Sequence, residues 1–369
     1  MSMREDVVND EFTGAQEAPV FPHLNDLIDP IGGCALQAAA TLRLADLIAA
    51  GVDRVEPLAV AAGADEDALR RLMRYLCLRG VFSVSATGTF GLNDFSTLLM
   101  EGDPSQLRVS LDTDGFAGRF DRVVAEMANV VRTGQPAYAK VFGRSVYDDL
   151  TAVPPAGNTF TRLRAKHSAE FAPLVAEACN WSGVRHVNDV GGGTGALLAA
   201  VVSRHSHLTG TVIDLPEHEP EALELLRSAG VAGRCTFDGR DFFAPLPAAD
   251  VHLLSNVLFN WNDDDAVRIM KRCAEAGPAH SSQPSVPSAE GRVLVLERLL
   301  FEVSDGYDED AVMSAALDLR LMAISGGRQR TLADFERLGR RSGMSLASMK
   351  DLDRGLVLLE FRPIPRVNE

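Results

Sequence analysis

A glycine-rich turn at residues 191–195 is the part of the sequence whose residue types and spacing most clearly predict chemistry. It follows the apolar run His186–Val190, which holds one carboxylate, Asp189, and it precedes a segment rich in alanine and leucine. Glycines at alternate positions, 191, 193 and 195, allow positive φ and let a ligand approach because they have no Cβ. The free amides of a following helix would point at that ligand. The pattern therefore predicts a strand, a tight turn and a helix around a nucleotide-like guest.

A second carboxylate strengthens this prediction. The next apolar run, Leu208 to Ile213, ends in Asp214, and a carboxylate about twenty residues after such glycines can accept both ribose hydroxyls. An NAD-dependent oxidoreductase also combines a glycine-rich turn with a later carboxylate that binds the ribose. Its usual glycine spacing is GxGxxG, however, and no such turn lies near the N-terminus.

Composition limits the classes of partner. The chain has 369 residues and a net charge of −15, which disfavours nucleic acid, since phosphate contacts need clustered Lys and Arg. No apolar run approaches the roughly 20 residues that span a bilayer, and residues 1–10 lack the apolar core of a signal peptide. We therefore expect a cytoplasmic protein, without a membrane partner, for a small neutral or cationic ligand. The five cysteines form no CxxC pair, so we expect buried free thiols and no metal site.

The N-terminal part is predicted to be helical. Residues 1–17 are polar and acidic, and we expect a disordered tail. Residues 18–104 read as helices followed by a short hairpin at 81–92, a winged-helix pattern. The candidate recognition helix, 65–80, has no clear basic excess, so we expect a dimerisation domain rather than a DNA-binding one.

Residues 105–180 are predicted to form a helical middle layer that roofs a pocket, with helical segments at Ser105–Arg132, Ser145–Leu150 and Asn158–Asn180. From 181 to 369, strand and helix patterns alternate, which favours an α/β fold with a doubly wound, Rossmann-like parallel sheet. The end of the chain, Ser345–Met349 and Gly355–Phe361, reads as a closing antiparallel pair. Residues 277–291, rich in Pro and Ser, indicate a long surface loop.

Five motifs occur in order along the chain: Asp189–Gly195, Asp214-Leu215-Pro216, Gly239–Phe243, Asn260–Asp263 and Gly326–Thr331. With them, nearly the whole chain resembles the class I, S-adenosylmethionine-dependent small-molecule O-methyltransferases. It looks closest to their anthracycline-tailoring branch, of the carminomycin 4-O-methyltransferase and aclacinomycin 10-hydroxylase type. The resemblance implies S-adenosylmethionine as cofactor and S-adenosylhomocysteine as its product. It also implies a small aromatic substrate and a homodimer formed through the N-terminal helices.

The resemblance also implies roles for individual residues. The glycine turn would hold the methionine end of the cofactor, Asp214 the ribose hydroxyls, and Asp241 and Phe242 the adenine. Arg164 would pair with the cofactor carboxylate, a charge-assisted contact that suits a guanidinium. The whole set expected to bind the cofactor is Arg164, Asp189, Gly191, Gly192, Gly193, Asp214, Leu215, Asp241, Phe242, Ser255, Asn256 and Trp261.

Two departures from the family pattern concern catalysis. Where caffeate-type members have His-Asp, this chain has Phe259-Asn260, so a histidine base is excluded at this position. Of the two glutamates that bracket that histidine in the family, Glu297 retains the first and Gln329 replaces the second. Catalysis by proximity and orientation, which can supply on the order of 7–11 kcal/mol, is our hypothesis, with Asn260 hydrogen-bonding the substrate and Phe259 walling the pocket.

Other readings stay open at this stage. His167 and Tyr147 are alternative bases, although each also fits a purely structural role. Phe259-Asn260, in place of the family's His-Asp, and Gln329 are also compatible with a methyltransferase-fold enzyme that binds the cofactor but performs hydroxylation or decarboxylation. A non-enzymatic ligand or DNA sensor built on the winged helix is a third class, and methylation of carbon or nitrogen a fourth.

Overall fold

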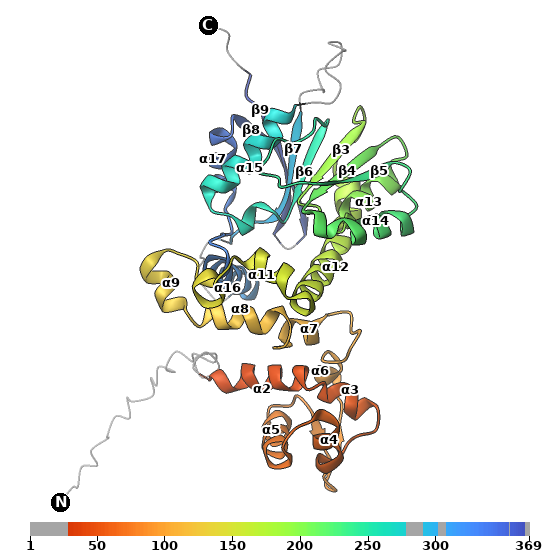
Figure 1. The fold of residues 1–369 in the computed structure, drawn as a ribbon, viewed down its shortest axis with the longest axis vertical. Coiled ribbons are helices and arrows are strands. Elements are labelled where there is room, and N and C mark those ends of the chain that lie inside the picture. Colours follow the sequence, from red (N-terminus) through yellow and green to blue (C-terminus); the bar gives the residue numbers. More distant parts are fainter. Residues whose placement is uncertain (1–28, 278–290, 302–307, 354, 366–369) are drawn as a thin grey trace, which may run out of the picture. The chain divides into compact units, whose positions relative to one another are not determined.

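The computed structural model describes residues 29–277, 291–301, 308–353 and 355–365 (Figure 1). The chain forms two compact units, Met1–Leu111 and Asp112–Glu369. This division lies near the predicted boundary at 104/105, but helix α7 (Leu107–Leu111) belongs to the first unit because it packs against α2 (Pro30–Thr41). The predicted tail at 1–17 and almost all of the predicted loop at 277–291 lie outside the described residues.

The N-terminal unit is helical with one small hairpin. Strand β1 (Ser83–Val84) pairs antiparallel with β2 (Phe90–Gly91), which confirms the predicted hairpin. Buried apolar side chains, among them Leu58, Met73 and Phe82, form its core. Its other helices are α3 (Leu44–Ala49), α4 (Val55–Ala62), α5 (Glu66–Leu78) and α6 (Asp94–Thr97).

The second unit begins with helices that precede the sheet. They are α8 (Phe116–Val124), α9 (Met127–Thr133), α10 (Tyr138–Phe142), α11 (Val146–Ala152) and α12 (Pro154–Ala178). The prediction of one helical segment from Ser105 to Arg132 was wrong. The segment breaks into α7, α8 and α9, and Gly115 in an extended conformation begins the second of these.

The sheet is doubly wound, as predicted. Its strand order is β5-β4-β3-β6-β7-β9-β8, and the final two strands are antiparallel, which confirms the predicted closing pair. Strand order reverses beside β3, because β4 lies on one side of it and β6 on the other. Ligands of such sheets bind beyond the carboxyl ends of the strands at this reversal. The strands are β3 (His186–Val190), β4 (Thr209–Asp214), β5 (Cys235–Gly239), β6 (Val251–Ser255), β7 (Arg292–Arg298), β8 (Met344–Asp353) and β9 (Leu356–Pro363).

Helices cover both faces of the sheet (Figure 1). Helix α12 with α13 (Ala196–Arg204) and α14 (Glu219–Ser228) buries one apolar core against it. On the other face, α15 (Asp263–Ala276) and α17 (Leu332–Arg341) bury a second core. The remaining elements are η1 (Pro216–His218), η2 (Leu258–Asn260) and α16 (Glu309–Ile324).

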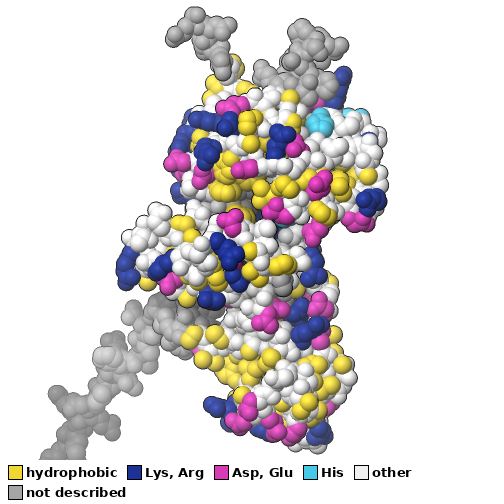
Figure 2. Space-filling model, viewed as in Figure 1, with side chains coloured by type: hydrophobic (Ala, Val, Ile, Leu, Met, Phe, Trp, Pro, Cys, Tyr) yellow, Lys and Arg dark blue, Asp and Glu magenta, His cyan; other side chains and the backbone are white. Residues whose placement is uncertain are grey.

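The surface charge, the helices and the cysteines test three further predictions from the sequence. Figure 2 shows basic and acidic side chains interspersed over the visible face of the described residues, unlike the clustered positive charge of a nucleic-acid surface. No described helix combines the length and the apolar character needed to cross a bilayer. The five cysteines are free thiols. Cys235 and Cys273 are buried as predicted, Cys77 and Cys179 are partly buried, and Cys34 is exposed, so the prediction of burial was wrong for Cys34 and held only in part for Cys77 and Cys179.

Leu253 lies fully buried in β6 and contributes to the core beneath α13. We expect Leu253→Ala to lower the free energy of unfolding by about 2–5 kcal/mol, because a cavity replaces its packed methyl groups. Urea unfolding followed by circular dichroism measures the change. Leu223→Ala, at an α14 position that is 38% exposed, is the control and should change stability by no more than about 0.5 kcal/mol. Equal losses in both variants would contradict the assignment of the core.

Candidate active site

The glycine turn has the backbone that its sequence predicts. Gly191, Gly193 and Gly195 adopt φ of 71°, 54° and 74°. A Cβ on Gly191 would lie 2.8 Å from Val257, and one on Gly195 would lie 2.8 Å from Val212. Positive φ and close approach both require glycine at positions 191 and 195.

Asp214 is bound to this turn. The amide of Gly193 donates to Asp214 Oδ2 over 2.7 Å, and the amide of Leu215 donates to Asp214 Oδ1 over 2.7 Å. The carboxylate at the end of β4 is thereby fixed beside the turn that follows β3. The two motifs that sequence spacing linked are in direct contact.

Asp189, the penultimate residue of β3, has a buried carboxyl group with no hydrogen-bond donor among the described residues. Its side chain is 1% exposed, and neither of its oxygens has a hydrogen-bond partner among the described residues. Burial, together with the charge of Asp214, raises the pKa of Asp189 to about 7. A buried unpaired carboxylate is costly, so this position suits a cationic ligand that brings the missing partner.

A first cavity lies between the glycine turn and α12. Arg164 reaches into it from α12, and Arg164 Nη2 donates to the carbonyl oxygen of Asn256 over 2.7 Å. Asn256 follows β6 and holds a positive φ of 52°, a strained conformation of the kind that gathers at functional sites. The residues that line the cavity are Thr161, Arg164, Ala165, Ser168, Asp189, Gly191, Gly192, Gly193, Thr194, Leu197 and Ser255.

A second, larger cavity of about 490 Å³ adjoins the first. Its walls are mainly aromatic and aliphatic and come from α8, α11, α12 and α16, with Phe116 and Phe160 edge to face at 5.4 Å. Arg164 and Ser168 line both cavities. A ligand in one cavity would therefore lie next to a ligand in the other.

The turn that replaces the family's histidine lies in the wall of this second cavity. Phe259 and Asn260 line it together with Asn256, Glu297 and Gln329. Glu297 Oε1 accepts from the amide of Phe259 over 2.9 Å, and the side-chain amide of Asn260 donates to the carbonyl oxygen of Asn256 over 3.3 Å. Burial raises the pKa of Glu297 to about 7. The structure thus brings the predicted catalytic residues together.

Gln329, another predicted residue of this wall, has partners that sequence reasoning missed. The hydroxyl of Ser314 on α16 donates to Gln329 Oε1 over 2.5 Å, and Asp318 accepts from the amide of Gln329 over 2.7 Å. His167 also lines the cavity, and burial lowers its pKa, which favours the neutral imidazole.

Five residues predicted to bind the cofactor line neither cavity: Asp214, Leu215, Asp241, Phe242 and Trp261. Asp241 is exposed and accepts from the amide of Phe243 over 2.8 Å. The ring of Phe242 meets that of Trp261 edge to face at 5.9 Å, and Tyr147 stacks on Trp261 at 5.8 Å. Asp214 and Leu215 lie at the end of β4, Asp241 and Phe242 follow β5, and Trp261 follows β6, so all five lie beyond or at the carboxyl ends of parallel strands.

Thr161, Ala165 and Ser168 were missed as lining residues. With Arg164 they have the spacing of one helical face of α12. That spacing was a usable signal once Arg164 had been singled out.

Comparison with known proteins agrees with this geometry. Residues 124–345 match the O-methyltransferase domain, and residues 33–102 match the O-methyltransferase dimerisation domain. The chain is 39% identical to aclacinomycin 10-hydroxylase RdmB of Streptomyces purpurascens, over 88% of this chain and 84% of that one. It is 37% identical to 2,7-dihydroxy-5-methyl-1-naphthoate 7-O-methyltransferase of Streptomyces carzinostaticus, over 88% and 91% of the two chains.

Solved structures give the same result. TnmH superposes with a TM-score of 0.86 at 37% identity, covering 94% of this chain and 99% of that one. The O-methyltransferase NcsB1, solved with S-adenosylmethionine and 2-hydroxy-5-methyl naphthoic acid, gives a TM-score of 0.82 at 34% identity, covering 92% and 98%. The chain belongs to the family of S-adenosylmethionine-dependent O-methyltransferases with an N-terminal dimerisation domain, which confirms the predicted resemblance.

The raised pKa of Asp189 makes stability depend on pH. The folded protein holds this proton up to about pH 7, whereas an unfolded aspartate loses it near pH 4. Stability contributed by the neutral carboxyl group is therefore full below about pH 4 and is lost as the pH rises to 7. Asp189→Asn should leave cofactor-free protein more stable than wild type at pH 8, by on the order of 2 kcal/mol relative to the difference at pH 4.5.

Urea unfolding of both proteins at the two pH values measures this effect. Glu297 titrates in a similar range but does so in both proteins, so its contribution cancels. Asp241→Asn, at an exposed carboxylate, is the matched control. An Asp189→Asn effect that is equal at pH 4.5 and pH 8 would show that this carboxyl group is not the titrating one.

Proposed function

We propose that this enzyme methylates a phenolic hydroxyl of an aromatic polyketide or related secondary metabolite, by proximity and orientation and without a histidine base. The observation that carries the proposal is the pair of adjoining cavities that share Arg164 and Ser168. Methyl transfer needs donor and acceptor in line and close together. Two cavities with a common wall meet this requirement.

The first cavity, of about 40 Å³, has room for only part of S-adenosylmethionine, and its residues suit the methionine end of that cofactor. Asp189, buried and unpaired among the described residues, would face a positively charged part of the cofactor, and the glycine turn leaves room for its methionine end. Asp214 would accept from the ribose hydroxyls, and Arg164 would bind the cofactor carboxylate. We further propose that Ser255 touches the cofactor and that Asp241 and Phe242 flank its adenine. When bound, the cofactor supplies an activated methyl group on a sulfonium.

The second cavity fits a flat aromatic acceptor. Its volume of about 490 Å³ falls in the range of small-molecule sites, which are mostly apolar with a few placed polar groups. Phe116, Phe120 and Phe160 form a cluster of edge-to-face rings in its wall. Relatives named for a naphthoate methyltransferase activity and for aclacinomycin hydroxylation support an acceptor of this kind.

The residues that handle the proton are part of the proposal. Phe259 cannot accept a proton, so it walls the cavity, and Asn260 hydrogen-bonds the acceptor. Phenols conjugated to a carbonyl are acidic enough for partial ionisation near neutral pH, and water can then take the proton. His167, which lies in the same cavity and has a pKa lowered by burial, is the alternative acceptor of the proton.

A second function has one specific observation in its favour. One relative, 39% identical over most of both chains, is a hydroxylase, so a methyltransferase-fold enzyme that hydroxylates or decarboxylates an anthracycline-like substrate is the alternative. For either function we propose a cytoplasmic homodimer formed through the N-terminal helices, on the basis of the dimerisation-domain match.

Product analysis separates the two functions. Purified protein is incubated with S-adenosylmethionine and a panel of hydroxynaphthoic acids, anthraquinone phenols and anthracycline phenols. We expect S-adenosylhomocysteine and a product about 14 Da heavier, since one CH₂ is added in a transfer governed by orientation. Mass spectrometry detects both. A product that gains an oxygen while the cofactor stays intact would contradict methyl transfer and establish the alternative.

Asp214 tests the cofactor site. Asp214→Asn should weaken S-adenosylmethionine binding about 10- to 100-fold in isothermal titration calorimetry, because hydrogen bonds to a charged group contribute about 1.5–3 kcal/mol. The control is Glu217→Gln, two residues past Leu215 in η1, whose carboxylate accepts from the hydroxyl of Thr151. An unchanged dissociation constant for Asp214→Asn would remove that residue from the site.

A further inference from the structure

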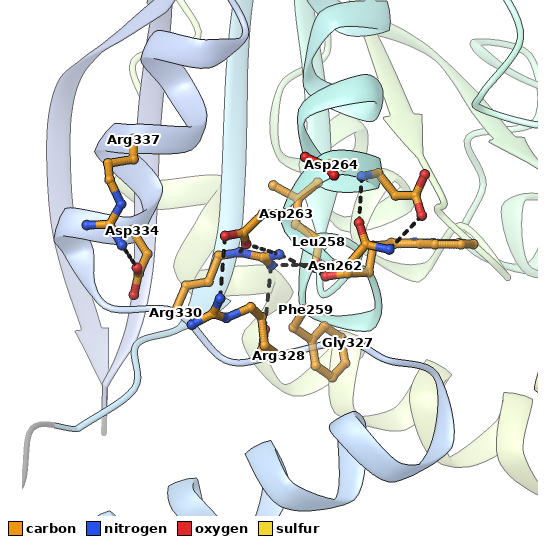
Figure 3. A network of polar contacts seen from close by, with 12 residues as sticks. Leu258, Phe259, Asn262, Asp263, Asp264, Gly327, Arg328, Arg330, Asp334 and Arg337 are labelled. Carbon is orange, nitrogen blue, oxygen red and sulfur yellow. Dashed lines mark hydrogen bonds and ion pairs between the residues drawn. The ribbon is translucent and has the colours of Figure 1, made fainter. Parts of the chain in front are cut away.

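Arg330, between α16 and α17, is a fully buried arginine whose contacts converge on one turn of the acceptor cavity (Figure 3). Its Nη1 donates to the carbonyl oxygen of Leu258 over 2.8 Å, and its Nη2 donates to that of Trp261 over 2.8 Å. Leu258 and Trp261 immediately flank Phe259 and Asn260. One planar guanidinium thus holds both ends of the turn that replaces the family's histidine.

The charge of Arg330 has its own partner. Asp263 Oδ1 accepts from Arg330 Nε over 3.0 Å and from Nη2 over 2.9 Å. A buried charge is tolerated where it is paired and where its remaining donors are satisfied. Asp263 is the first residue of α15, so the ion pair also ties the turn to the start of that helix. Arg328 lies 3.4 Å from the other oxygen of Asp263.

Backbone contacts hold the same turn from two more directions. The amide of Arg328 donates to the carbonyl oxygen of Phe259 over 2.9 Å. A Cβ on Gly327 would lie only 2.3 Å from that carbonyl oxygen, so the segment packs directly against the turn. From the sheet, Glu297 accepts from the amide of Phe259. The peptide groups on both sides of Phe259 are therefore fixed.

We propose that Arg330 is a positioning residue, which sets the orientation of Phe259 and Asn260 in the acceptor cavity and so aligns the acceptor for methyl transfer. The proposal rests on the proposed function in so far as that function assigns the two residues to the acceptor wall. Orientation is the main source of rate where no base is supplied, and a displacement of about 1 Å can cost on the order of 100-fold. A fixed turn is what such catalysis needs from the protein.

Lysine cannot replace this arginine fully. A guanidinium offers five donors in a rigid plane, whereas an ammonium is a point charge on a flexible stem. Lysine at position 330 can keep the pairing with Asp263, but it cannot also span both carbonyl groups in a fixed geometry. Arg330→Lys should therefore fall between wild type and Arg330→Gln.

Hydrogen exchange tests the proposal without any acceptor. In Arg330→Gln, mass spectrometry should show faster exchange of the amides of residues 257–262, while β3 and the N-terminal unit keep wild-type protection. Asp263→Asn, which retains the shape of the side chain, and Gly327→Ala, which presses on the turn from the other side, should give the same local pattern. Arg337→Gln is the matched control, since Arg337 forms an exposed ion pair with Asp334 on α17, and such pairs contribute little.

Steady-state kinetics are the second measurement. Each rate is divided by the concentration of cofactor-binding sites measured by calorimetry, so that misfolded protein does not count as lost activity. For the acceptor that the panel identifies, Arg330→Gln should lower kcat/KM about 10- to 100-fold with a raised acceptor KM, while the cofactor dissociation constant stays within twofold. A merely structural residue would lower the number of sites and leave the KM unchanged. Arg337→Gln should stay within twofold of wild type.

The outcomes are distinct. Wild-type exchange at 257–262 in all three variants, or uniform loss of protection across the second unit, would overturn the positioning role. A local change in exchange together with an unaltered acceptor KM would overturn it too. If the panel yields no methylated product, the proposed function fails, and the exchange pattern still decides whether Arg330 holds the turn.

Discussion

The hydrogen bond from Arg164 to the carbonyl oxygen of Asn256 joins the two halves of the site. Arg164 comes from α12, whose other lining residues belong to both cavities, and Asn256 follows β6 at the end of the sheet. The same carbonyl oxygen accepts from the side chain of Asn260. The first cavity, the wall of the second cavity and the end of the sheet therefore meet at the peptide group of Asn256, a residue whose positive φ is held by these contacts.

What the sequence predicted well was local in the chain. The glycine spacing and the apolar segment that follows it predicted the turn at 191–195. The alternation of apolar strand and helix patterns predicted the parallel sheet. The link between the turn and Asp214 also followed, because parallel strands place their carboxyl ends at one edge of the sheet. Helix boundaries were less well predicted. Only residues 112–115 separate α7 from α8, and only Ala125 and Glu126 separate α8 from α9, so the helical pattern of the sequence continues across both breaks.

Contacts between segments that are far apart in the chain could not be predicted from the sequence. Nothing in the spacing of Gly326–Thr331 indicates that Arg330 reaches carbonyl groups near residue 260, since the pairing depends on how α16 returns to the sheet. The motif drew attention to Gln329, where the family has a glutamate. The neighbouring residue makes the larger set of contacts with the turn. Sequence motifs locate such segments, and only the fold shows which side chain of a motif points inward.

Two buried carboxyl groups show how the same physical effect leads to different roles. Burial raises the pKa of both Asp189 and Glu297 to about 7. Glu297 has a permanent partner in the amide of Phe259, so its energetic cost is offset within the protein and its position fixes the turn. Asp189 has no such partner among the described residues, so the cost of burying its charge is avoided by a bound proton or offset by a cationic ligand. One buried carboxyl group thus holds the turn at Phe259, and the other stays unpaired beside the glycine turn. This difference agrees with the proposed function, in which the rate depends on alignment and Asp189 faces the cofactor.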